Sequence, residues 1–387
     1  MVINWQKAEL NPARRTSPGV GIAGKRLWNH HLIGPKLGTP EEVVGWLGAV
    51  QAQEYSLAKW GVALRTQGVT DAEMDRLLAE GDIVRTHVMR PTWHFVLPAD
   101  LRWLLQLTGP RVQALNAGRY RQLGLDHATL ARGHVLLSDA LRGANLHTRA
   151  ELARVLGEGG IATDGQRLAH LLMHAELEAV ICSGGRRGKQ FTYALFDERV
   201  PKGREFDRDV ALAELARRYY TSHGPATAHD FAWWSGLTVA DSRRGAGLAG
   251  SKLVEVAADG KVYWAPAGVT GPEVGETTVH LLPVYDEYLG SYRDYSPVFD
   301  PALNERLEPG SDTLLGSILV VNGQVVGGWK RRVKAREVII TVDALIPLGA
   351  TERAGIDAAA AEFSRFLELP VRVEFKRGRC GALSRTQ

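Results

Sequence analysis

The chain has 387 residues and a formal net charge of +4, from 47 Lys and Arg against 43 Asp and Glu. Hydrophobic residues make up 45% and charged residues 23%, which excludes a disordered or collagen-like chain. At roughly 100 to 200 residues per domain, this length predicts two to four domains. The two cysteines, Cys182 and Cys380, are too few for a disulfide framework or a four-cysteine zinc site. Because no apolar run of about 18 residues occurs, we expect a cytoplasmic protein that does not enter a membrane.

The first part of the chain has the element order of a winged helix. A capping box at Thr39-Pro40-Glu41-Glu42 starts one helix, because Thr39 can cap the helix and Glu42 can return the hydrogen bond. Two further helices are predicted over Tyr55–Arg65 and Asp71–Glu80. Two short β-rich segments then flank Pro91. Helices followed by a short β-hairpin are typical of this motif.

The same order recurs twice, and a β-rich segment closes the chain. A second capping box begins at Thr148, Asp164 is predicted to cap a helix through Glu176, and a hairpin with a glycine-rich basic tip spans residues 181–194. We therefore predict an α+β fold of three tandem winged helices and a small β-barrel-like domain, in a C-shaped monomer. The predicted segments are a flexible tail at 1–18, winged helices at 19–110, 111–206 and 207–276, and the β-domain at 277–387.

Most familiar catalytic motifs are missing. The chain has no GxxxxGK[ST], no GxGxxG, no HExxH and no GxSxG, which excludes several nucleotide-binding and hydrolase classes. His170 and His174 have the i, i+4 spacing of one helical face, but no glutamate follows the first histidine and no third ligand is apparent. We favour a surface or packing pair over a metal site, and we expect no metal and no cofactor.

Two basic clusters suggest contact with nucleic acid. The hairpin tip carries Arg186, Arg187 and Lys189, which suits a wing that reaches phosphates or enters a groove. The segment from Lys330 to Arg336 places five cations in seven residues. On a strand, alternate residues share a face, so four of these cations would form one positive stripe. The four residues are Lys330, Arg332, Lys334 and Arg336. An ordinary solvated turn and simple solubilisation remain the alternatives for the two clusters.

A pair of glutamines, Gln51 and Gln53, follows the first capped helix. An amide does not titrate near neutral pH, so neither side chain is a general base of the usual kind. Each can only orient a water molecule or stabilise developing charge. Glutamine chemistry therefore needs a substrate that is already activated.

Three segments together resemble the AlkZ-like DNA glycosylases. They are Gln51-Ala52-Gln53, the segment Met89-Arg90-Pro91-Thr92-Trp93-His94-Phe95-Val96, and Leu281-Leu282-Pro283-Val284-Tyr285-Asp286-Glu287-Tyr288. The resemblance runs from about Gly21 to Phe375. It implies three winged helices and a C-terminal β-domain around duplex DNA, and excision of N7-alkylated purines or unhooking of crosslinks made through guanine N7. The sister branch, similar to YcaQ, has an acidic residue where this chain has Gln53, so the resemblance favours the narrower AlkZ-like branch.

The resemblance also assigns site residues. Gln51 and Gln53 match the catalytic Gln-x-Gln motif. Arg90 is a candidate DNA contact, and His94 matches a recurrent histidine of the family, for which a packing or DNA-contact role and a catalytic role both remain open. Asp286 and Tyr288 are candidate channel-facing residues, with a buried hydrogen-bonded corner as the alternative. An N7-alkylated purine carries a positive charge and leaves as a neutral base, so two amides that position water are sufficient. No lysine adjoins the motif as a Schiff-base nucleophile, which predicts a monofunctional hydrolytic glycosylase.

Two competing functions fit parts of the sequence. A winged-helix transcription regulator would explain the repeated units and the basic hairpin, although it gives the glutamine pair no purpose. A DNA-binding paralogue without activity would share every segment. The expected partner in each case is double-stranded DNA, carrying alkylated or crosslinked purines for the enzyme, inside a bacterial cytoplasm.

Overall fold

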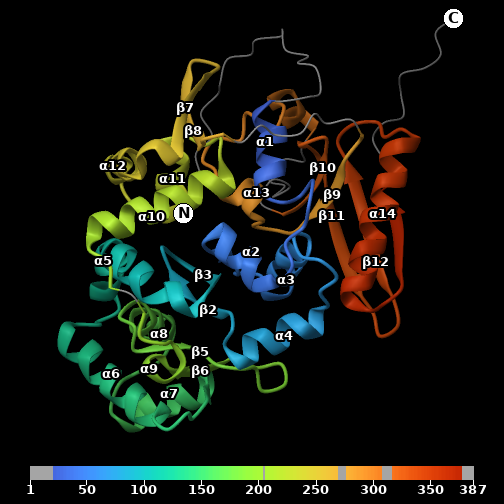
Figure 1. The fold of residues 1–387 in the computed structure, drawn as a ribbon. Helices are drawn as coiled ribbons and strands as arrows, with labels where there is room; N and C mark the ends of the chain where they lie inside the picture. The colour runs from blue at the N-terminus through green and yellow to red at the C-terminus, as the bar shows by residue number, and fades with distance from the viewer. Residues whose placement is uncertain (1–20, 204, 269–275, 307–315, 377–387) are drawn as a thin grey trace, which may run out of the picture.

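The computed structural model describes residues 21–203, 205–268, 276–306 and 316–376 (Figure 1). The predicted flexible tail at 1–18 lies outside these residues. In the described part of the chain, no helix has both the length and the apolar character needed to cross a membrane. Helices and strands are mixed throughout, as predicted for an α+β fold.

The first unit packs four helices around a three-stranded sheet of order β1-β3-β2. The predicted capping box is confirmed, because the Thr39 side chain accepts the backbone N–H of Glu42 and Glu42 caps Thr39 in return. Pro91 lies inside a strand rather than between two strands. The elements are α1 (Ile22–Asn29), α2 (Pro40–Leu47), β1 (Val50–Gln51), α3 (Tyr55–Ala63), α4 (Asp71–Glu80), β2 (Val84–Val88) and β3 (Arg90–Val96).

The second unit has a sheet of order β4-β6-β5 and two long helices that the sequence pattern did not predict. In α5, the first half is buried on nearly every side and Pro110 interrupts the pattern, so no single apolar stripe marks the helix. The cap predicted at Asp164 is wrong, because α8 begins at Arg167 after Gln166. The elements are α5 (Pro98–Gln122), α6 (His127–Leu141), β4 (His147–Thr148), α7 (Arg149–Glu158), α8 (Arg167–Leu177), β5 (Ile181–Ser183), β6 (Thr192–Leu195) and α9 (Phe196–Arg199).

The third unit is three helices followed by the two-stranded hairpin of β7 and β8. Thr227 and Thr238 each cap a helix through a capping box. The elements are α10 (Arg208–His223), α11 (Ala228–Ser235), α12 (Val239–Ala249), the short 3-10 helix η1 (Gly250–Lys252), β7 (Leu253–Ala258) and β8 (Lys261–Pro266).

The C-terminal part is an open sheet of order β13-β12-β11-β10-β9, so the predicted barrel-like closure is wrong. The strand pairs are antiparallel except β12 with β13, which are parallel. A parallel pair needs a crossover connection, and α14 supplies it while covering the sheet. The elements are β9 (Val279–Leu282), α13 (Glu287–Gly290), the 3-10 helix η2 (Pro301–Arg306), β10 (Ser317–Val321), β11 (Gln324–Val333), β12 (Val338–Ala344), α14 (Ala350–Leu367) and β13 (Val371–Phe375).

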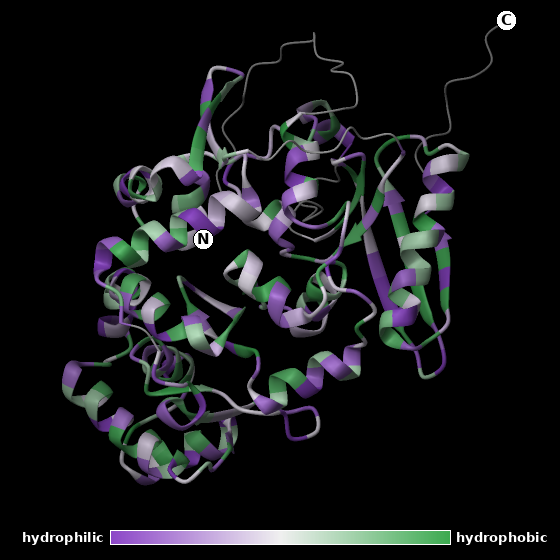
Figure 2. Cartoon of the chain, in the orientation of Figure 1, coloured by the Kyte–Doolittle hydropathy of each residue, from purple (hydrophilic) through white to green (hydrophobic). Residues whose placement is uncertain are grey.

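The first unit and the C-terminal sheet share one hydrophobic core. Trp60 of α3 packs against Phe363 and Phe366 of α14, with ring centroids 4.9 and 5.4 Å apart, and its indole N–H donates to the carbonyl of Leu281 at 2.9 Å. Strand β9 is therefore tied to α3 of the first unit. Hydrophobic and hydrophilic residues alternate along most helices and strands (Figure 2).

Candidate active site

Gln51 lies at the end of β1, which pairs with β3. Helix α2 ends at Gly48, whose φ of +81° favours glycine and turns the chain toward the sheet. Gln51 is in register with His94, and the N–H of Ala52 donates to the carbonyl of Trp93 at 2.7 Å. Directly opposed residues of antiparallel strands project to the same face. The side chains of Gln51 and His94 are therefore neighbours on one face of the sheet.

Two charged residues hold Gln51 in place. The carboxylate Oε1 of Glu287 accepts the backbone N–H of Gln51 at 2.7 Å. Arg90 Nη2 donates to the side-chain Oε1 of Gln51 at 3.1 Å. A guanidinium group has no acceptor, so the amide oxygen must face Arg90 and the amide nitrogen must point away from it. One anion and one cation thus determine the position of this amide.

Glu287 is a buried anion, with only 2% of its surface exposed. Burial alone would raise its pKa, but His223 at 3.5 Å, the hydroxyl of Ser291 and the N–H of Gln51 lower the pKa to about 2. The indole N–H of Trp234 donates to the same carboxylate at 3.0 Å. Glu287 therefore remains ionised at neutral pH, beside the backbone of Gln51.

Arg90 is positioned by a close contact between the β2–β3 turn and the end of α11. Met89 has a φ of +63°, and its N–H donates to the hydroxyl of Thr108 at 3.2 Å. A Cβ at Gly236 would lie 2.2 Å from the carbonyl oxygen of Met89, so only glycine allows this approach. Burial lowers the pKa of Arg90, and the nearby Glu287 opposes that shift. Arg90, predicted as a DNA contact, is thus half-buried and bound to Gln51.

His94 is fully buried. Burial and the nearby Arg90 lower its pKa to about 3, against a weaker opposite effect of Glu287 and the backbone of Thr92. Neither ring nitrogen forms a hydrogen bond of ordinary geometry within the described part of the chain. His94 is therefore a neutral imidazole beside Gln51.

Gln53 is exposed and lies in the turn between β1 and α3. Because β1 ends at Gln51, the two glutamines do not share one strand. Gln53 is free of the two charged contacts that fix Gln51.

Asp286 and Tyr288 are both buried, so of the two arrangements considered for them the channel-facing one is wrong. Asp286 forms a bidentate ion pair with Arg65, at 2.9 and 2.8 Å, and accepts the N–H of Tyr288 at 2.9 Å. The Tyr288 hydroxyl donates to the carbonyl of Gly323 at 2.8 Å, which joins α13 to the β10–β11 turn. The buried hydrogen-bonded corner is the arrangement that the structure shows.

The basic hairpin tip folds against neighbouring residues. The guanidinium of Arg186 lies over the rings of Tyr55 and Phe191, at 5.2 and 5.4 Å, and 3.7 Å from a carboxylate oxygen of Asp75. Arg187 donates to Glu151 at 2.8 Å and to the carbonyl of Leu146 at 2.7 Å. The remaining predicted cation of the tip, Lys189, is exposed.

The predicted stripe divides into a strand part and a turn part. Lys330 and Arg332 are exposed on β11, which ends at Val333. Lys334 and Arg336 lie in the turn before β12, and Lys334 donates to Glu337 at 2.6 Å. The four cations are therefore not on one strand, because β11 ends at Val333, whereas the predicted stripe needs a strand that continues to Arg336.

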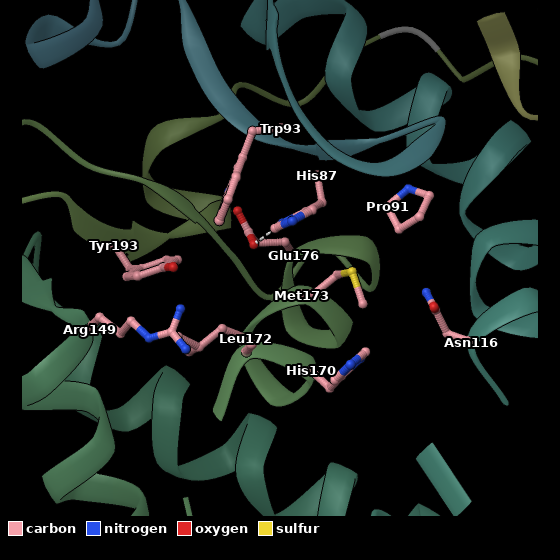
Figure 3. Close-up of a pocket in the computed structure, with 11 residues that line it drawn as sticks. His87, Pro91, Trp93, Asn116, Arg149, His170, Leu172, Met173, Glu176 and Tyr193 are labelled. Carbon is pink, nitrogen blue, oxygen red and sulfur yellow. Dashed lines mark hydrogen bonds and ion pairs between the residues drawn. The ribbon is translucent and has the colours of Figure 1, made fainter. Parts of the chain in front are cut away.

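A pocket of about 180 Å³ lies on the other side of β3, between the first and second units (Figure 3). Trp93 and His87 line it, and His87 Nδ1 contacts the buried Glu176 carboxylate at 2.5 Å. Its lining, all within the described residues, includes no serine, cysteine or lysine that could act as a nucleophile. His170 also lines it, whereas His174 contacts His134 at 3.0 Å, and no cluster of metal-ligand type occurs in the described ranges. The pocket is therefore separate from the Gln51 face.

Sequence reasoning did not identify Glu287 as part of the site. The residue lies in the quoted segment, but an acid between Asp286 and Tyr288 has no distinguishing spacing. Its link to Gln51 spans 236 residues, so no local signal could show it.

The chain belongs to the AlkZ-like family of DNA glycosylases, hydrolases that act on N-glycosyl bonds; the family described as "DNA glycosylase AlkZ-like" matches residues 44–366. The chain is similar to an interstrand DNA cross-link repair glycosylase of Streptomyces sahachiroi, with 26% identity over 355 residues, 86% of this chain and 92% of that protein. The solved structure of Streptomyces sahachiroi DNA glycosylase AlkZ has the same fold, with a TM-score of 0.72 and 24% identity. The match covers 91% of this chain and 98% of the Streptomyces sahachiroi chain.

Proposed function

We propose that this protein is a monofunctional DNA glycosylase that hydrolyses the N-glycosidic bond of cationic N7-alkylpurines and unhooks N7-guanine interstrand crosslinks in duplex DNA. The observation that carries the proposal is the fixed amide of Gln51, held by Glu287 and Arg90 in a member of a glycosylase family. The similar protein of known activity repairs interstrand crosslinks, which supports the crosslink substrate.

The chemistry fits an amide that cannot titrate. Alkylation at N7 makes the purine cationic, so it departs as a neutral base without general acid catalysis. The amide oxygen of Gln51 has two lone pairs, and Arg90 uses one. The second lone pair can accept a hydrogen bond from the attacking water, which orients the water toward C1′. The amide N–H₂ can donate to an oxygen of the sugar or its phosphate.

The ionised Glu287 adds a negative potential beneath this site. Positive charge develops on the deoxyribose as the bond to the base breaks, and a fixed buried anion lowers the energy of that state. Because Glu287 is buried and its oxygens accept several hydrogen bonds, it is not placed to attack the sugar itself. Gln53, exposed beside Gln51, is proposed as the second water-orienting amide.

We propose that three winged helices, over 19–110, 111–206 and 207–276, and the β-domain at 277–387 form a C-shaped monomer that holds the duplex. The helix-rich units, each with its own small sheet, support this division. Exposed cations supply the first phosphate contacts: Lys189, Lys330, Arg332 and Arg336. Arg186, Arg187 and Lys334 can join them by exchanging a carboxylate partner for a phosphate.

Excision of 7-methylguanine from a duplex, and unhooking of a nitrogen-mustard crosslink, test the proposal directly. Replacing Gln51 and Gln53 together by Ala should abolish excision and leave DNA binding nearly unchanged. Gln122→Ala, an exposed amide at the end of α5, is the matched control. A single preferred operator in footprinting, with no abasic product, would favour a transcription regulator and would falsify the glycosylase proposal.

A further inference from the structure

Tyr285 is the one exposed residue in the stretch from Leu281 to Leu289, where every other residue except the partly exposed Val284 is buried. Its side chain is large and hydrophobic, yet 37% of the residue's surface is exposed. The flanking Asp286 and Pro283 are buried. A ring that keeps this much exposure can contact a ligand.

The backbone at Tyr285 is strained. The N–H of Asp286 donates to the carbonyl of Pro283 at 3.2 Å, which closes a tight turn with Tyr285 as its third residue. Tyr285 has a φ of +61°, a conformation that turns normally assign to glycine or asparagine. Strained residues of this kind concentrate at functional sites, where the surrounding structure enforces them. Here Asp286, fixed by its ion pair with Arg65, holds the turn.

The strained turn lies beside the candidate catalytic amide. A Cβ built at Gly290 would lie 3.2 Å from the carbonyl oxygen of Tyr285 and 3.8 Å from Oε1 of Gln51. The backbone carbonyl of Tyr285 and the amide oxygen of Gln51 therefore both lie close to Gly290. The indole N–H of Trp233 donates to the carbonyl of Gly290 at 3.1 Å and fixes the spacing from the other side.

We infer that Tyr285 is a substrate-recognition residue, whose ring stacks against the positively charged purine beside Gln51 and selects cationic bases over neutral ones. The inference rests on the proposed glycosylase function. The face of a tyrosine ring carries negative potential, so it attracts a cation in addition to the stacking that any base would gain. The attraction ends when the glycosidic bond breaks and the base becomes neutral, which favours release of the product.

The test compares two duplexes that differ only in charge. One contains 7-methylguanine, which is cationic, and the other contains 7-deaza-7-methylguanine, which has the same shape and is neutral and uncleavable. Dissociation constants are measured for both with the full chain carrying Gln51→Ala, so that the first duplex stays intact. Tyr285→Leu removes the ring, Tyr285→Phe keeps it, and Tyr285→Gly relieves the strained φ.

We expect Tyr285→Leu and Tyr285→Gly to weaken binding of the cationic duplex by about three- to thirtyfold relative to the neutral duplex. Tyr285→Phe should retain the preference. Phe375→Leu is the matched control, because Phe375 is also 37% exposed but lies on β13, in another part of the chain. Since Tyr285→Gly suits the backbone, a loss in that variant does not come from misfolding.

If the Tyr285 variants lost the same affinity for both duplexes, the ring would contribute only ordinary stacking, and the inference would be overturned. It would also be overturned if the variants lost no affinity for either duplex. The proposed function fails separately: absence of 7-methylguanine release by the unmodified enzyme would refute glycosylase activity. The ratio of the two dissociation constants would still decide whether Tyr285 recognises the charge.

Discussion

Arg90 donates a hydrogen bond to the amide oxygen of Gln51 at 3.1 Å, and the same Gln51 gives its backbone N–H to Glu287. The side-chain bond determines which end of the amide meets the substrate. We therefore expect Arg90→Ala to lower single-turnover excision by roughly 10²-fold, because a misplaced catalytic group costs about that much. Added guanidinium ion should restore part of the rate. No rescue, together with a large loss of stability, would instead indicate a purely structural role.

Glu287 should make the fold sensitive to acid. Its pKa in the folded protein is about 2, below the ordinary glutamate value of about 4.3. The carboxylate therefore stabilises the fold above that ordinary value, and the stabilisation is lost as the pH falls toward 2. Urea unfolding between pH 6 and pH 2.5 should show a shallower pH dependence for Glu287→Gln than for the unmodified protein. Glu158→Gln, which removes an exposed carboxylate, should follow the unmodified curve.

His94 should not contribute a titration to the activity. Its pKa is lowered to about 3, so the ring is neutral from pH 5 upward in the folded protein. We expect the single-turnover rate to show no ionisation near pH 6.5 that depends on this residue, and His94→Asn should give a parallel profile from pH 5 to 9. A limb near pH 6.5 that disappears in the variant would contradict the neutral assignment.

Asp286 should matter for stability rather than for DNA contact. Asp286→Ala leaves Arg65 buried without its bidentate partner, which should cost about 3 to 5 kcal/mol of unfolding free energy. The double variant Arg65→Met/Asp286→Leu should recover a large part of this loss. Chemical denaturation measures both, and the DNA affinity of the folded double variant should stay close to that of the unmodified protein. A selective loss of affinity would instead show that Asp286 takes part in DNA binding.

Lys330 and Arg332 should contribute to the salt dependence of DNA binding. Each phosphate contact adds about one to the slope of log K against log salt, so the double alanine variant should lower the slope by about one to two. Arg187→Ala should change it less, because Arg187 is already paired with Glu151. Equal slopes for the double variant and the unmodified protein would remove β11 from the DNA interface.

Local signals predicted local structure well. The capping boxes at Thr39 and Thr148 and the helix end at Gly81 are confirmed, since each depends on residues within one turn. The long helix α5 was missed because its burial is not confined to one face. The barrel-like closure was wrong because strand order depends on the crossover through α14. The exposure of Tyr285 beside the buried Asp286 was not predicted, because it depends on a turn with a positive φ that no local signal marks.

The carboxylate of Glu287 receives hydrogen bonds from Gln51 in the first unit and from Trp234 in the third, while itself belonging to the segment after β9. Three distant stretches of chain must therefore dock before the glutamine has its working position. A chain ending before residue 277 would lose the anion that completes the site, and it would also lose the C-terminal half of the hydrophobic core that the first unit shares.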